Sequence, residues 1–171
     1  LGLVLTGYVP ATAAGASIPI IMTATGLGLL IAAVWAATLA QNAVAGVFAI
    51  FAGFWLSYAA LVLGLTHNWF GIIADDVPRT QELFLLTWML MIGLLTVASL
   101  RLPLAFTVLF ALITLALLLA LLATANASTS LTKAAGYVVF LFALLGAYLF
   151  LDAMSTATGG KPLPLGAPII R

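Results

Sequence analysis

Long apolar stretches alternate along this chain with short polar breaks. A helix that crosses the hydrocarbon core of a bilayer needs about 20 mostly apolar residues. Six stretches approach or reach that length: residues 1–14, which is the shortest, 18–40, 44–66, 80–100, 103–125 and 131–154. Strands of a membrane barrel would instead alternate apolar and polar residues, and apolar runs such as 115–122 show no alternation. The pattern predicts an all-α bundle of six transmembrane helices.

The polar breaks indicate where helices begin. Ser17 is expected to cap the second helix, with Pro19 in its first turn, where the missing N–H leaves nothing unsatisfied. Asn42 is the expected cap of the third helix, and Ser130 that of the sixth. Because only residues 41–42 separate the second and third helices, these two should be antiparallel neighbours.

Composition places this chain among integral membrane proteins. Hydrophobic residues make up 65% of it and charged residues 5%, where a soluble domain carries about 25% charged residues. The mean hydropathy is +1.33. No linker separates the predicted helices, so we expect one domain over residues 1–171. The chain begins with Leu and its first apolar stretch is short, so we expect the natural N-terminus to lie further upstream.

The chemistry that the sequence offers is sparse. There is no cysteine and a single histidine, His67, which is expected in a loop, so neither a metal site nor a cofactor is predicted. A net charge of +1 predicts no nucleic-acid surface. No nucleophilic triad or phosphate-binding loop is visible, so we do not expect an enzyme.

The few charges lie at the expected helix ends and in loops. With six helices, both termini share one side, which collects three basic residues, Arg101, Lys161 and Arg171, against two on the other, Arg79 and Lys133. The positive-inside rule then places the termini in the cytoplasm. Asp152 is the carboxylate on an otherwise apolar helix. It is either a solvated residue at the membrane surface or a carboxylate at the cytoplasmic mouth that titrates or pairs with Lys161.

Small and aromatic residues mark helix faces. The small ones allow close helix packing or border a pore; they include Gly26, Gly28, Gly53, Gly136 and Gly146. On the third helix, Phe48, Phe51 and Trp55 follow helical spacing along one face. They either pack in the core or form an aromatic constriction that faces an aqueous path.

The order of these features resembles the acetate uptake transporter family, also called the succinate–acetate permeases. Leu1-Gly2-Leu3 matches the tail of the family's first motif, and Asn42 precedes a stretch from Phe48 to Trp55 that matches the motif of its third helix. The sixth helix offers Ala135-Gly136-Tyr137 and Ala147-Tyr148-Leu149, then Asp152, and the chain ends with Leu163-Pro164-Leu165-Gly166.

The resemblance implies six helices around a path in each protomer, a homohexamer, and proton-linked passage of acetate and other small monocarboxylates, sometimes succinate. A bacterial or archaeal cytoplasmic membrane is the expected location. The family narrows its path with side chains that correspond here to Thr6, Phe51 and Ile113, or to Tyr8 in place of Thr6 after a shift of two residues. Phe51 stands where the family has Tyr, and the second helix has Leu30 and Ala37 where the family has Gln and Glu.

The scarcity of polar groups along the expected path indicates in which protonation state a carboxylic acid crosses it. A carboxylate in hydrocarbon without a partner is strongly disfavoured, so we expect the neutral acid to cross together with its proton. Two other hypotheses remain open at this point: a non-transporting subunit of a larger membrane complex, and a channel for a neutral solute such as ammonia or urea.

Overall fold

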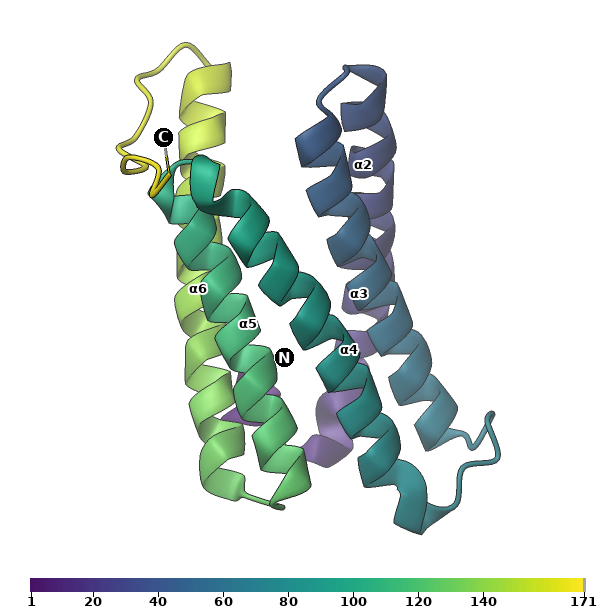
Figure 1. Ribbon diagram of the computed structural model, residues 1–171. Helices are drawn as coiled ribbons and strands as arrows, with labels where there is room; N and C mark the ends of the chain where they lie inside the picture. Colours follow the sequence, from purple (N-terminus) through teal and green to yellow (C-terminus); the bar gives the residue numbers. More distant parts are fainter. Residues whose placement is uncertain (171) are drawn as a thin grey trace. The chain divides into compact units, whose positions relative to one another are not determined.

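The computed structural model describes residues 1–170, and these residues form helices and connecting turns without any strand. The α-helices are α1 (Gly2–Leu5), α2 (Gly28–Thr38), α3 (Asn42–Thr66), α4 (Val77–Ala98), α5 (Leu104–Ala125) and α6 (Thr129–Ala157) (Figure 1). Within this part of the chain, five stretches are long and apolar enough to cross a membrane: Thr12–Thr38, Asn42–Thr66, Ala74–Arg101, Leu104–Ala125 and Thr129–Ala157. The predicted all-helical membrane fold is confirmed.

The first apolar stretch is not the continuous helix that residues 1–14 predicted. Helix α1 ends at Leu5, and Gly7 then takes a positive φ of 83°. Pro10 is extended, with ψ at 147°, before a 3₁₀ segment begins (Ala11–Ser17). Proline disfavours a helical residue before it, and a left-handed glycine is a common helix end. Two local breakers therefore divide a segment whose hydropathy alone is typical of a span.

The second span begins earlier than predicted and passes through Pro19. Ser17 lies at the end of the 3₁₀ segment, where its hydroxyl donates to the Ala14 carbonyl at 2.6 Å, so it is not the cap. A π-helical segment, Ile20–Leu27, follows the proline and leads into α2. Proline removes one hydrogen bond and clashes with the carbonyl four residues earlier, and changes of helix type on either side accommodate that local disruption.

The predicted caps of α3 and α6 were each misplaced by one or two residues. Asn42 is the first residue of α3, and the cap position is Gln41, whose carbonyl accepts from the Ala45 N–H. Ser128, rather than Ser130, caps α6 and accepts from the Leu131 N–H at 3.4 Å. In both cases a residue with positive φ, Ala40 or Ala127, reverses the chain just before the cap. The sequence shows no glycine there to mark the reversal.

The chain divides into two compact units. Residues 10–77 form the first, called here the α2–α3 unit, and residues 1–9 with 78–170 form the second, called the α4–α6 unit. In the α2–α3 unit the two helices pack antiparallel after a tight turn, as predicted, and Ile18 and Ile21 are buried against Ala59. Gly26 lies so close to α3 that a Cβ atom there would be 2.7 Å from the Leu56 side chain.

In the α4–α6 unit, α5 and α6 form the main antiparallel pair, and α1 packs on α6. Gly136 of α6 touches the end of α1, because a Cβ atom at this position would be 2.8 Å from the Thr6 methyl group. Ile92 of α4 and Phe110 of α5 are the largest hydrophobic side chains that are almost completely buried in the described residues. The predicted role of Gly26 and Gly136 at helix seams is therefore confirmed.

The long helices expose most of their apolar side chains. Leu94, Leu144 and Ile31 are each 68–69% exposed, and Trp35 is 67% exposed. A soluble protein would bury such residues, whereas hydrocarbon is as apolar as they are. These exposed faces fit contact with lipid or with other membrane-embedded chains.

Candidate functional site

The aromatic side chains predicted to form a constriction lie on α3. Phe48, Phe51 and Trp55 are all half-buried, and Trp55 packs against the Ile18–Ile21–Ala59 core. Two neighbours that the predicted set omitted join Trp55: Phe54 lies with its ring centroid 4.9 Å from that of Trp55, edge to face, and Tyr58 lies 6.3 Å from it. Much of this aromatic group therefore contributes to packing in the α2–α3 unit.

The remaining predicted constriction residues belong to the α4–α6 unit. Thr6 is the C-cap of α1. Its hydroxyl donates a hydrogen bond to the Gly2 carbonyl at 3.0 Å, and the residue contacts α6. Tyr8 is 81% exposed. Ile113 is half-buried on α5. Because Thr6 and Ile113 lie in one unit and Phe51 in the other, the constriction that they would share stays a prediction.

Asp152 has a defined structural partner. Its Oδ1 accepts a hydrogen bond from the Leu163 N–H at 2.7 Å. On the same face of α6, the Tyr148 hydroxyl donates to the Pro164 carbonyl at 2.9 Å and the Ser155 hydroxyl to the Lys161 carbonyl at 2.7 Å. Asp152 therefore binds the backbone of the returning chain, and in the described residues it forms no ion pair with Lys161. The role predicted for Asp152 at a mouth of the path stays a prediction.

The returning chain, residues 158–170, is called here the C-terminal strap. Its Leu165 carbonyl accepts from the Ala105 N–H at 2.9 Å, and its Gly166 carbonyl accepts from the Leu104 N–H at 3.4 Å. The first N–H groups of a helix have no partner within the helix, so the strap satisfies two of them at the start of α5. Gly166 has a φ of +77° and lies against Leu104, which explains why glycine suits this position.

The strap brings together motifs that are distant in the sequence. Tyr148 and Asp152 hold one side of it, while residues 163–166 cap α5 on the other side. The Ile169 and Ile170 N–H groups donate to the Leu100 carbonyl, at 3.1 and 3.0 Å. The C-terminal family motifs therefore form one structural clamp between α5 and α6.

A row of hydroxyl groups that was not predicted from the sequence joins α4 and the turn after it to α5. The Thr96 and Thr114 hydroxyl oxygens are 3.1 Å apart. The Ser99 hydroxyl donates to Thr107, and Thr107 donates to the Ser99 carbonyl, in a fully buried position. Two hydroxyl spacings were the available signal. Thr96 near the end of α4 lies three residues before Ser99, the first residue of the 3₁₀ turn that follows, and Thr107 and Thr114 lie seven apart on one face of α5. Such bonds stabilise helix packing within membranes.

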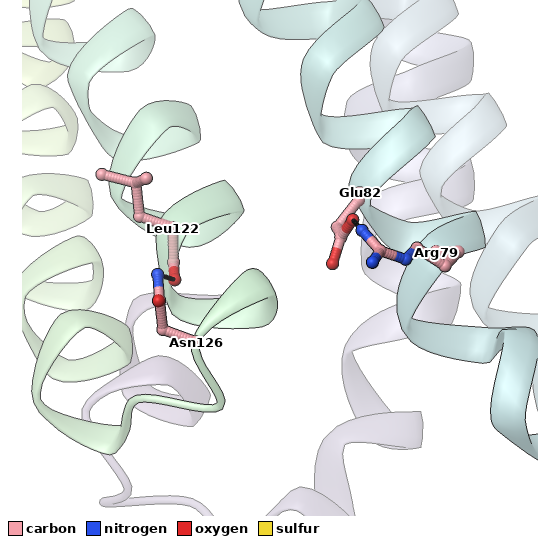
Figure 2. A network of polar contacts seen from close by, with 4 residues as sticks. All are labelled: Arg79, Glu82, Leu122 and Asn126. Atoms are coloured by element: carbon pink, nitrogen blue, oxygen red, sulfur yellow. Dashed lines mark hydrogen bonds and ion pairs between the residues drawn. The ribbon is translucent and has the colours of Figure 1, made fainter.

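A pocket of ≈ 420 Å³ opens at the other end of the α4–α6 unit from the strap. It lies where α4 begins and α5 turns into α6, and it is lined by Pro78, Gln81, Ala123, Thr124, Ala127, Ser128, Thr129 and Thr132. Figure 2 shows its surroundings: Arg79 and Glu82 pair on α4 at 2.7 Å, and the Asn126 side chain donates to the Leu122 carbonyl of α5. The pocket therefore combines hydroxyl and amide groups with apolar walls.

Comparison with known proteins agrees with this architecture. The chain is 29% identical over 129 residues to the ammonia transport outward protein 2 of Saccharomyces cerevisiae. That match covers 72% of the chain but spans only 44% of the yeast protein's length. The family model described as the GPR1/FUN34/yaaH family matches residues 1–160. The resemblance drawn from the motifs is thus confirmed, and this integral membrane chain belongs to the GPR1/FUN34/yaaH family, the acetate transporter family, whose members carry small solutes across membranes.

Proposed function

We propose that this chain passes acetate and related small monocarboxylic acids across the membrane, together with a proton. The family membership supports a transport function over that of a non-transporting subunit. The substrate class rests on the motifs shared with acetate transporters.

The observation that carries the neutral-acid mechanism is the position of the charges. Neither α3 nor α5 contains any charged residue, and α4 has none between Glu82 and its end. Arg79 is paired with Glu82 and 80% exposed, so it is not a partner for an anion at depth. A carboxylate would have to leave water without an ion-pair partner, at a cost of several kcal/mol. The neutral acid avoids that cost.

We propose that Thr6, Phe51 and Ile113 narrow the path, and that Phe51 is its gate. Uptake of labelled acetate into proteoliposomes should rise as the external pH falls toward about 4 to 5, where carboxylic acids titrate. Phe51→Ala should increase the flux, because it shortens the side chain at the narrowest point.

Phe150→Ala is the matched control, since Phe150 of α6 is 62% exposed and lies outside the proposed path. It should leave the flux unchanged. Uptake that ignores pH, together with an unchanged flux in Phe51→Ala, would contradict the mechanism.

A second candidate substrate is ammonia, which the name of the yeast relative favours. Ammonia is neutral and small, so the same uncharged path suits it. Excess ammonium at constant pH should inhibit labelled acetate uptake if the two solutes share the path. Ammonium-driven alkalinisation of the vesicle interior that acetate leaves unchanged would instead indicate a dedicated ammonia channel.

We further propose a homohexamer in a bacterial or archaeal cytoplasmic membrane, with a cytoplasmic C-terminus. The exposed apolar faces of the long helices are compatible with contacts between copies. Arg101 and Lys161 lie at one end of the α4–α6 unit, because the strap that contains Lys161 bonds to Leu100. This supports placing both basic residues on the same side of the membrane when the positive-inside rule is applied. Native mass spectrometry tests the number of chains.

A further inference from the structure

The pocket between the start of α4 and the α5–α6 turn offers hydrogen bonds without charge. Among the described residues that line it, none is ionisable. Charged residues next in sequence to the lining are Arg79 and Glu82 on α4, which form an ion pair at 2.7 Å, and Lys133, which follows the lining residue Thr132 on α6. On α5 the lining residues are Ala123 and Thr124. A pocket of ≈ 420 Å³ is large enough for a small organic molecule and several waters.

Most polar groups of the lining already have partners in the protein. The Thr124 hydroxyl donates to the Ala120 carbonyl and the Thr132 hydroxyl to the Ser128 carbonyl, both at 3.0 Å. The Ser128 hydroxyl oxygen accepts from the Leu131 N–H. In the described part of the chain, the Gln81 amide makes no hydrogen bond to protein, so both its donor and its acceptor are available to a ligand.

A primary amide pairs with a neutral carboxylic acid in a way that it cannot pair with the anion. Glutamine presents a carbonyl oxygen and an NH₂ group side by side. The acid O–H donates to the amide oxygen while the amide N–H donates to the acid carbonyl, which makes two hydrogen bonds in one ring. A carboxylate has only acceptors. It can therefore accept from the amide N–H but has no proton to donate to the amide oxygen, and its second oxygen would lie close to that oxygen, where the two repel.

We propose that this pocket is a loading site for short carboxylic acids in their protonated form, and that Gln81 is the residue that recognises them. The inference rests on the proposed transport of monocarboxylic acids and deepens it. It places the selection of the neutral form at the membrane surface, before the solute meets the uncharged helices. Binding by so few atoms is weak, in roughly the millimolar range.

Ligand binding to the purified full chain in detergent tests the site directly, by saturation-transfer NMR with acetate and with acetamide. Acetamide has the shape of acetic acid, forms the same paired hydrogen bonds, and stays neutral across the pH range. Acetate binding should weaken as pH rises from acidic to neutral, whereas acetamide binding should be the same at both. Gln81→Leu should reduce both signals about tenfold, the value of two lost hydrogen bonds.

Gln41→Leu is the matched control, because Gln41 is an exposed glutamine at the α2–α3 turn outside the pocket. It should bind both ligands as the natural chain does. Unchanged acetate and acetamide binding in a folded Gln81→Leu variant would overturn the proposal, as would acetate binding that is equally strong at acidic and neutral pH.

Transport kinetics separate this inference from the function on which it rests. In proteoliposomes at acidic pH, Gln81→Leu should raise the KM for acetate about tenfold and leave the maximum rate within about twofold. A natural chain that carries no acetate would contradict the proposed function, while the NMR result would still decide whether the pocket binds acid. If the natural chain carries acetate and Gln81→Leu has the same KM, the loading site would be overturned while the proposed function would stand.

Discussion

Single small residues decide how closely the helices approach one another. Gly136 and Gly146 are both glycines of α6, yet their surroundings differ. A Cβ atom at Gly136 would lie 2.9 Å from the backbone nitrogen of Thr6 and 3.0 Å from Leu5 Cβ. At Gly146 nothing lies within 4 Å. The first is a contact between α1 and α6, and the second is an open surface.

Gly136→Ala should therefore destabilise the protein, by about 1–3 kcal/mol, because backbone atoms of α1 must move. Gly146→Ala should be neutral or slightly stabilising, since alanine favours helix and meets no neighbour. Thermal unfolding in a fixed detergent, followed by intrinsic fluorescence, measures both. Equal melting temperatures for the two variants would contradict the described packing of α1 on α6.

The C-terminal strap shows how an element without regular structure stabilises two helices. It accepts hydrogen bonds from the first turn of α5 and is held to α6 by Tyr148, Asp152 and Ser155. A buried or half-buried helix start needs such partners. Asp152 lies near the C-terminal end of α6, where the helix dipole disfavours a negative charge. Its place there is explained by its role as the acceptor of the Leu163 N–H.

Asp152→Leu should loosen the strap, because it removes the acceptor of the Leu163 N–H, with a loss of about 1–3 kcal/mol. Asp152→Asn keeps an oxygen acceptor and should lose less. Hydrogen exchange of the Leu163 and Ala105 amides measures the change locally. If exchange at both amides stays as slow in Asp152→Leu as in the natural chain, Asp152 does not hold the strap.

At the scale of the whole molecule, the proposed orientation follows from the two ends of the α4–α6 unit. The strap and Arg101 lie at one end, and the α5–α6 turn with Lys133 lies at the other. The natural chain has no cysteine, so a single introduced thiol reports its own side of the membrane.

A membrane-impermeant thiol reagent applied to intact cells should label Ala127→Cys, which lies in the α5–α6 turn. It should label Lys161→Cys in the strap only after the membrane is permeabilised. Both residues are exposed, so access depends on the side rather than on burial. Labelling of Lys161→Cys in intact cells, with Ala127→Cys protected, would reverse the proposed orientation.

The sequence by itself determined the class of the protein and the sites of its main spans. Apolar runs of about 20 residues with charges confined to their ends have no stable alternative to helices in lipid, because every backbone polar group must be satisfied internally. The antiparallel α2–α3 pair and the family followed from the same one-dimensional information. Local hydropathy could not show that Gly7 and Pro10 divide the first apolar stretch, nor that the second span continues through Pro19.

Only the tertiary structure decided which polar residues meet. The Asp152–Leu163 bond joins residues 11 apart and the Thr96–Thr114 contact residues 18 apart, and no local pattern specifies such partners. The position of Gln81 in a pocket likewise depends on the approach of α4 to the α5–α6 turn. The hydrophobic effect that places a segment in the bilayer is non-directional, so it depends on local composition alone. A hydrogen bond needs a partner at a definite distance and angle, which only the folded chain provides.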